Sequence, residues 1–428
     1  MNLEPRSFVA VLFGMVLSTS NALAQEPASP VGAEAPSSPP PSESATPTSV
    51  PAAASPASEA SLVPPAAGQL RIDGPKGSSV RLGLLLQPQL QAVNNPPALG
   101  GGYAKNIYVR RARILLGGTL MDNIEYFVDT DYPNLFLDSN TAAAGAPETF
   151  AKNTPGMNVQ DAFVTFKALG DMLKVDAGYM LPPMAHNAVQ GAGTLYSFDY
   201  FSYTFQHNAG GVFLTSGNAV GRDAGVQLRG LLVDGHVEYR VGLFQGLREN
   251  RTATNLEARN FFRITGRVQV NLLDAEPNFF YAGTYLGAKK IASIGGSYDF
   301  QDSYKYFAVD GIVDMPLGPG VVTGQVNLAH WDGGTFIPAT ALAKQTALMG
   351  EAGYAIAEFR LNPILRVERL WPTGGADQTR IGGGVAFWPY GHNNNIKAFY
   401  AHVTTDGVGA AASSSYNQFN LQWQVYFF

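Results

Sequence analysis

Beyond residue 69 the sequence alternates apolar and polar residues in segments of about ten, the spacing of β-strands with two different faces. In the segment 109–120, VRRARILLGGTL, every second position from Ala112 to Leu120 is apolar or glycine, whereas Arg111 and Arg113 share the opposite face. The same period of two recurs at 80–91, 161–169, 173–180, 236–244 and 262–273. No long segment with the 3.6-residue period of a helix follows residue 69. The pattern predicts an all-β chain.

Two β architectures fit such alternation. A soluble sandwich buries its apolar faces in a shared core, whereas a membrane barrel turns them toward lipid and lines a lumen with its polar faces. Ionisable residues recur on nearly every polar face here, which favours the barrel. About sixteen segments can be marked, and tight connections alternate with long ones at 133–157, 185–221 and 247–260. We therefore expect a transmembrane antiparallel β-barrel of about 16 strands, with a soluble secreted β protein as the alternative.

The first 69 residues predict export and a spacer. Arg6 precedes the apolar run FVAVLFGMVL, and ALA at 22–24 offers small residues before a cleavage point, so residues 1–24 resemble a signal peptide. The apolar run is shorter than the roughly 20 residues of a spanning helix, which argues against a membrane anchor. Residues 25–69 are rich in Pro, Ala and Ser and are expected to form a disordered linker. The barrel domain is then 70–428.

The final segment, FNLQWQVYFF at 419–428, also alternates and ends in aromatic residues. An amphipathic last strand with an aromatic end is what outer-membrane assembly machinery usually recognises. One irregularity stands out: the apolar frame passes through Phe427 rather than Phe428.

Composition removes several classes of function. The chain has no cysteine, so disulfides and thiolate metal sites are excluded. Its net charge of −5 shows no basic domain, so no nucleic-acid partner is expected. His186 and His207 have no third residue at ligand spacing, and no nucleophile, phosphate-binding or zinc-protease motif stands in a convincing context. We predict no metal, no cofactor and no enzymatic activity; a barrel enzyme would need a Ser/His pair that the sequence does not single out.

Three stretches resemble the phosphate-selective porin O and P family: VRRARILLGGTLMDNIEYFVDTDY (109–132), VQDAFVTFKALGDMLKVDAGYMLPPM (159–184) and GRDAGVQLRGLLVDGHVEYRVGLFQG (221–246). The Arg-Arg-Ala-Arg strand and the DAGYMLPPM strand end are the more specific markers. The resemblance implies a trimer of sixteen-stranded barrels, with the third long loop folded into each pore. It also implies passive transport of anions such as phosphate along a ladder of arginines to a lysine-containing constriction.

The strand arginines of that ladder correspond to Arg111 and Arg113, and the alternation adds further lumen-facing candidates. The full set of candidate anion-attracting residues is Arg81, Arg111, Arg113, Arg229, Arg240, Arg263, Arg267, Arg366 and Arg380. Acidic residues occupy the same faces in similar number, so the arginines either attract anions or pair with wall carboxylates such as Glu125 and Asp129. We expect Arg111 and Arg113 to set charge preference more than stability. Arg110, on the lipid-facing frame near a rim, is either a contact for lipopolysaccharide phosphate or an arginine whose charged end extends to the membrane interface.

The third long loop, 185–221, departs from the family because it contains neither Lys nor Arg. Its candidate constriction residues are Tyr196, Asp199, Tyr200, Tyr203 and His207. Its aromatic side chains either contact solutes or pack the loop against the wall.

These features together predict an outer-membrane porin that forms a water-filled channel for small hydrophilic solutes, with a mild preference for anions. The expected partners are outer-membrane lipid, lipopolysaccharide and two further copies of the chain in a homotrimer. The alternatives are a porin for neutral or other solutes and a structural barrel that acts as a tether through its linker.

Overall fold

The computed structural model describes residues 70–95, 102–140, 150–152, 156–203, 221–247, 261–337, 339, 342–409 and 412–428. The predicted signal peptide and linker lie outside these residues. The barrel strands are β2 (Ser79–Asn94), β3 (Tyr103–Met121), β4 (Ile124–Asp131), β7 (Asn158–Lys167), β8 (Lys174–Met180), β9 (Asp223–Leu232), β10 (Val237–Phe244), β11 (Arg263–Asn271), β12 (Ile291–Gln301), β13 (Tyr304–Leu317), β14 (Gly320–Asp332), β15 (Gln345–Ile356), β16 (Leu361–Pro372), β17 (Gln378–Phe387), β18 (Asn394–Thr405) and β19 (Ser414–Phe427).

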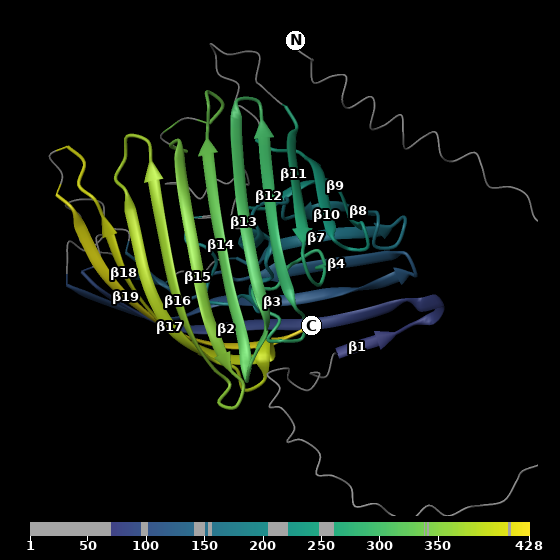
Figure 1. Ribbon diagram of the computed structural model, residues 1–428, viewed down its shortest axis with the longest axis horizontal. Helices are drawn as coiled ribbons and strands as arrows, with labels where there is room; N and C mark the ends of the chain where they lie inside the picture. Colours follow the sequence, from purple (N-terminus) through teal and green to yellow (C-terminus); the bar gives the residue numbers. More distant parts are fainter. Residues whose placement is uncertain are drawn as a thin grey trace, which may run out of the picture. The chain divides into compact units, whose positions relative to one another are not determined.

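These 16 strands close into a single barrel. Each pairs in antiparallel register with the next in sequence, and β19 pairs with β2 through contacts such as Leu421 with Leu90. In Figure 1 the strands β12 to β17 cross the near side, while β2, β3 and β4 cross behind them. Closure leaves no barrel strand with an unpaired edge, which a sheet in lipid requires. The predicted fold class, a transmembrane antiparallel β-barrel of about 16 strands, is confirmed.

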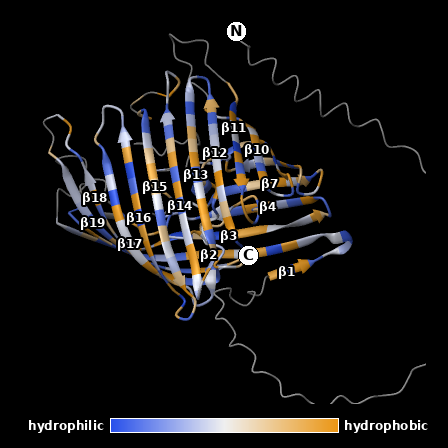
Figure 2. Cartoon of the chain, viewed as in Figure 1, coloured by the Kyte–Doolittle hydropathy of each residue, from blue (hydrophilic) through white to orange (hydrophobic). Residues whose placement is uncertain are grey.

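The alternation read from the sequence sorts the side chains between the two faces of the wall. On β3, Ile114 and Leu116 are exposed on the outside, whereas Arg111 and Arg113 are buried inside the barrel. Figure 2 shows the same alternation of hydrophobic and hydrophilic residues along the other strands. The apolar exterior and polar interior are opposite to the arrangement of a soluble sandwich, as the sequence predicted.

A short strand, β1 (Leu70–Asp73), continues the line of β19. It pairs with the first residues of β2, from Ser79 to Leu82, just beyond the place where β19 ends opposite Leu84. The 3-10 turn η1 (Pro75–Gly77) joins β1 to β2. In Figure 1, β1 accordingly lies beside the end of the chain marked C. The added strand covers backbone groups of β2 that β19 does not reach.

The connections at one end of the barrel are mostly short, such as 122–123, 233–236 and 318–319, and those at the other end include the long ones. The long connection between β8 and β9 runs inward. Its described residues are 181–203 and 221–222, and the first of these ranges carries the 3-10 turns η3 (His186–Val189) and η4 (Ala192–Thr194). The third long loop therefore folds into the barrel, as expected. Three small elements complete the chain: β5 (Asp138–Asn140), β6 (Phe150–Lys152) and η5 (Gly391–Asn393).

A second inward segment was not expected from the sequence. Residues 272–290, between β11 and β12, leave the end that carries the short turns and place Phe279, Tyr281 and Leu286 inside the barrel. Among the described residues, no helix is long and apolar enough to cross a membrane.

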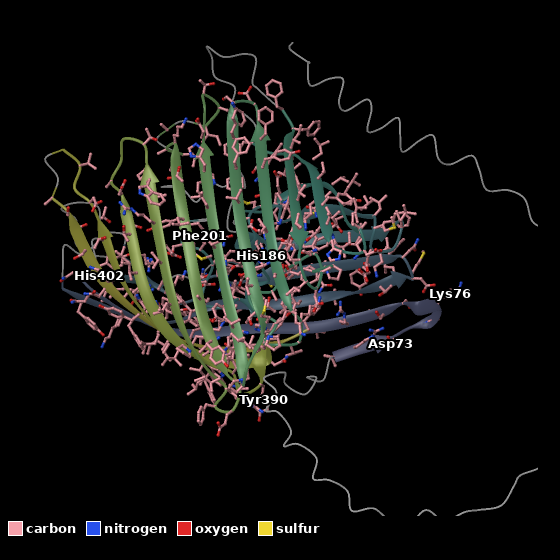
Figure 3. The ribbon with its side chains drawn as sticks, viewed as in Figure 1. Asp73, Lys76, His186, Phe201, Tyr390 and His402 are labelled. Carbon is pink, nitrogen blue, oxygen red and sulfur yellow. The ribbon has the colours of Figure 1, made fainter. Side chains whose placement is uncertain are left out.

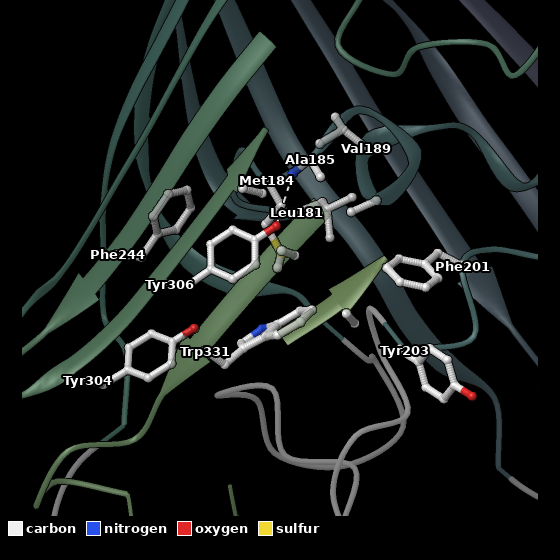
Figure 4. Close-up of a cluster of buried hydrophobic side chains, with 14 of the residues drawn as sticks. Leu181, Met184, Ala185, Val189, Phe201, Tyr203, Phe244, Tyr304, Tyr306 and Trp331 are labelled. Carbon is white, nitrogen blue, oxygen red and sulfur yellow. Dashed lines mark hydrogen bonds between the residues drawn. The ribbon is translucent and has the colours of Figure 1, made fainter. Parts of the chain in front are cut away.

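The inward loop packs against the wall strands β13 to β15 around a core of aromatic side chains. Phe201, Tyr304, Tyr306 and Trp331 are almost completely buried there, and the Tyr306 hydroxyl accepts a hydrogen bond from the backbone N–H of Ala185 (3.3 Å; Figure 4). This core fills part of the lumen beside β13 to β15.

Candidate functional site

The two inward segments meet backbone to backbone in the middle of the barrel. The N–H of Gly191 donates to the carbonyl of Tyr281 (2.9 Å), and the N–H of Tyr281 donates to the carbonyl of Val189 (3.2 Å). A third bond runs from the N–H of Gly283 to the carbonyl of Thr194 (2.8 Å). The loop that enters from one end and the segment that enters from the other therefore form one hydrogen-bonded unit.

Side chains reinforce this junction at His186. Its ring stacks on the ring of Tyr281 at 4.4 Å between centroids, and its Nε2 lies 3.0 Å from a carboxylate oxygen of Glu276. The Nδ1 faces the amide of Gln190 at 3.0 Å. His186, labelled in Figure 3, is completely buried. The ring nitrogens of this buried histidine both have partners within the junction, which supports a structural role. In the described residues, no group of three or more His, Cys, Asp or Glu is arranged to hold a metal ion.

The inward loop is also held to the wall by two cations. Arg366 donates to the carbonyls of Asp199 (2.8 Å) and Tyr200 (2.6 Å). Lys397 on β18 donates to the carbonyls of Leu195 (2.7 Å) and Ser197 (3.0 Å). Lys397 was missed from the sequence, although its place two residues after Asn395 on the inward face of β18 was a usable signal.

A β-bulge turns the side chain of Arg110 toward the inside of the barrel. The register between β2 and β3 shifts between Leu86 and Pro88, so that Arg110 and Arg111 both turn inward. Arg110 Nε lies 2.9 Å, and Arg111 Nη2 2.6 Å, from the carboxylate of Asp199. The predicted contact of Arg110 with lipopolysaccharide is therefore wrong, because alternation alone cannot reveal an extra residue in one strand. Burial alone would raise the pKa of Asp199, but the charges of Arg110 and Arg111 hold that pKa below its ordinary value.

Most of the candidate arginines lie inside the barrel in ion pairs with carboxylates. The pairs are Arg111 with Asp199, Arg113 with Asp129 and Asp131, Arg229 with Asp176, Arg240 with Glu238, Arg263 with Asp299, Arg267 with Asp310, Arg366 with Glu351 and Glu368, and Arg380 with Glu368. Of the nine candidates, only Arg81 has no ion pair among the residues that the structure describes. This pairing supports a structural role for most of the set.

The candidate loop residues are engaged in the same way. Hydroxyl groups of three tyrosines donate to the wall or to the loop itself: Tyr196 to Asn362 (3.1 Å), Tyr200 to the carbonyl of Gln190 (2.8 Å) and Tyr203 to Gln378 (2.7 Å). The carboxylate of Asp199 forms ion pairs with Arg110 and Arg111. His207 lies outside the described residues. These contacts support packing of the loop over contact with solutes.

A cavity of about 670 Å³ lies between the inward unit and the wall strands β2 to β9. Its lining includes six cationic side chains but only two carboxylates, Glu125 and Asp129. The cations are Arg71, Arg81, Arg113, Lys174, Arg222 and Arg229. The carboxylate partners of several of them, such as Asp161 and Asp176, are completely buried and do not line the cavity. The cavity therefore presents more positive than negative groups, although the chain as a whole is acidic.

No protein-family model matches the sequence, and no curated protein sequence matches it. Solved structures do match the fold. An anion-selective porin from Comamonas acidovorans superposes with a TM-score of 0.53 at 14% identity, covering 82% of this chain and all (100%) of that one. The outer membrane channel DcaP of Acinetobacter baumannii gives 0.52 at 10% identity, with 83% and 99% covered.

OmpF of Salmonella typhi, solved in complex with daunomycin, gives a TM-score of 0.51 at 12% identity, with 83% of this chain and 100% of that chain covered. At these identities the likeness is one of fold. The chain has the barrel of outer-membrane porins.

Proposed function

We propose that this protein is a passive diffusion channel of the outer membrane and that its water-filled path favours small anions. The observation that carries the proposal is the lining of the cavity, where six cations meet two carboxylates. A narrow aqueous path with low-dielectric walls strengthens the field of such charges. Ion pairs weaken that field, but they leave the guanidinium groups facing the cavity while several partner carboxylates lie behind them.

Phosphate is one solute that this lining suits, since guanidinium groups match its oxygens. We propose phosphate as one small anion among others, because the features expected of a specific site are missing from the loop. The sequence of residues 185–221 has no Lys or Arg. The ammonium group of Lys397 donates hydrogen bonds to two carbonyls of the inward loop. Membership of the phosphate-selective porin O and P family is part of this proposal.

The proposal includes export through a cleaved signal peptide over 1–24, a spacer over 25–69 and a homotrimer of barrels in the outer membrane. The apolar exterior of the wall supports the membrane location. The similarity of fold to the anion-selective porin of Comamonas acidovorans supports the charge preference.

Reconstitution of the purified full-length chain into planar bilayers tests the channel itself. We expect discrete current steps whose size rises with salt concentration and which pass ions without added energy. In cells, the chain should fractionate with the outer membrane and run as a compact oligomer on gels until heated. An intact, membrane-inserted barrel that gives no current would overturn the proposed function.

A further inference from the structure

One arginine of the cavity differs from all the other candidates. Among the described residues, Arg81 on β2 has neither an ion pair nor a hydrogen bond from its guanidinium group, although it lines the cavity. Its cross-strand neighbour on β1 is Arg71, which is paired with Asp73 at 2.7 Å. Arg81 thus lines the cavity with no acceptor for its N–H groups among the described residues, and its cross-strand neighbour is a second arginine.

The position of Arg81 is fixed by an aromatic ring. Its guanidinium carbon lies 4.7 Å from the centroid of the Phe428 ring, a cation–π contact. A fork of donors held in one plane is suited to the two oxygens of a carboxylate.

The ring of Phe428 lies in a slot that the wall leaves for it. A Cβ atom on Gly83 would lie 2.7 Å from Cδ2 of Phe428, and one on Gly117 would lie 2.7 Å from Cζ. Both glycines face the lumen, and Gly117 is the cross-strand partner of Arg81. Any larger residue at either place would displace the ring. This slot explains why Phe428 departs from the apolar frame of the last strand: its side chain lies on the lumen side.

Further rings continue the row away from Arg81. Phe127 is the cross-strand partner of Gly117 and meets Phe428 at 5.5 Å between centroids, nearly edge to face. Phe163, opposite Phe127 on β7, extends the row to a fourth strand. At about 4.8 Å between strands, Phe127 lies roughly 10 Å along the wall from Arg81. A carboxylate carried on an aromatic ring can place its charge against Arg81 and its flat apolar face against the ring of Phe428, with Phe127 beyond it.

We propose that Arg81, Phe428 and Phe127 form a binding subsite for aromatic carboxylates on the wall of the cavity. The carboxylate group binds the edge of the Arg81 guanidinium, and the ring of the solute packs against the phenylalanine rings. This inference rests on the proposed function, since it assigns a class of solute to the same path. It also separates two properties of Arg81: its charge, which any anion feels, and its place beside a row of aromatic rings, which only an aromatic carboxylate uses fully.

Block of the channel current distinguishes these properties. The probes are benzoate and cyclohexanecarboxylate, which have the same charge and similar size but differ in aromaticity, added to wild-type channels in KCl. We expect benzoate to block more strongly. Arg81→Gln should weaken the block by benzoate roughly tenfold, the loss of one charged hydrogen-bonded contact. Arg81→Lys should keep the charge preference but reduce the difference between the two probes. Arg71→Gln, which removes an equal charge from the neighbouring strand, should retain that difference.

Heat-modified migration on gels shows that each variant is folded, and the reversal potential is recorded in the same membranes. Equal block by the two probes in wild-type channels, or unchanged block by benzoate in Arg81→Gln, would overturn the subsite while an anion-selective reversal potential left the proposed function standing. If Arg81→Gln fails to fold, the comparison of wild type with Arg81→Lys decides the question. Absence of any current in folded wild-type protein would instead overturn the proposed function.

Discussion

The imidazole Nε2 of His186 lies 3.0 Å from a carboxylate oxygen of Glu276, and this contact links chain entering the barrel from opposite ends. Both side chains are about 1% exposed, so no water competes for the bond. The position of the inward loop therefore depends on residues 272–290, which enter from the end with the short connections, as well as on the barrel wall.

We predict that Glu276→Gln loosens this unit. A hydrogen bond to a charged group is worth about 1.5–3 kcal/mol, and the substitution removes the charge while keeping the shape. The variant should lose its compact gel migration at a lower temperature and show larger current fluctuations. Glu125→Gln is the matched control, because Glu125 pairs with Lys167 where both side chains are partly exposed and such pairs contribute at most about 1 kcal/mol. Equal effects of the two substitutions would argue against a special role for the junction.

Arg113→Gln should reduce folded yield more than it changes charge preference. The guanidinium of Arg113 lies 3.1 Å from the carboxylates of Asp129 and of Asp131, and its removal leaves both carboxylates buried without their cation. Removing one partner of a buried pair costs about 3–5 kcal/mol. Arg81→Gln, which breaks no ion pair, should fold at the wild-type level. The yield of heat-modifiable barrel from the membrane fraction measures the difference, and a normal yield of Arg113→Gln with altered selectivity would restore the expectation drawn from the sequence.

Much of the fold follows from the sequence because a strand with lipid on one side and water on the other must alternate. That constraint correctly predicts Arg111 and Arg113 on the inside of the barrel and Ile114 on the outside. It fails where one residue is added to a strand, which is why the alternation assigns Arg110 to the lipid side although its side chain lies against Asp199.

The interior was harder to predict, because it is built from segments that have no period. Residues 272–290 carry no alternation. Their pairing with the inward loop depends on contacts between distant parts of the chain, such as His186 with Glu276, which are 90 residues apart. The aromatic cluster Phe279–Tyr281, in a connection between two strands, was the available signal. Whether an arginine forms an ion pair also depends on which residues face it on the neighbouring strands. The register between the strands determines those residues.

Asp199→Asn should release the two arginines that its carboxylate holds. Arg110 and Arg111 would then lie in the lumen without their shared partner, and the net charge there would rise by one. We expect stronger anion preference together with noisier currents, since the loop loses an anchor to β3. Unchanged reversal potential and unchanged noise in the variant would show that the ion pairs of Asp199 with Arg110 and Arg111 are dispensable.

The same carboxylate predicts a dependence on pH. Because the folded-state pKa of Asp199 lies below its unfolded value of about 3.9, the stabilisation it provides is complete above that value and is lost only as the pH falls toward the folded pKa. The difference in current noise between wild type and Asp199→Asn should therefore be the same at about pH 7 and about pH 5. A difference that already disappears at about pH 5 would contradict the depressed pKa.

The reversal potential of single channels under a KCl gradient tests the central claim, that the path through the barrel is lined to favour anions. For wild-type protein we predict a potential of the sign that chloride permeation gives. The potential should be largest at low salt, because the field of the wall charges reaches about 30 Å at 0.01 M salt but only about 10 Å at 0.1 M. Arg81→Gln should move the potential toward cations more than Arg71→Gln does, since Arg71 already has a carboxylate partner. A cation-selective wild-type channel, or a potential that does not respond to Arg81, would contradict the account.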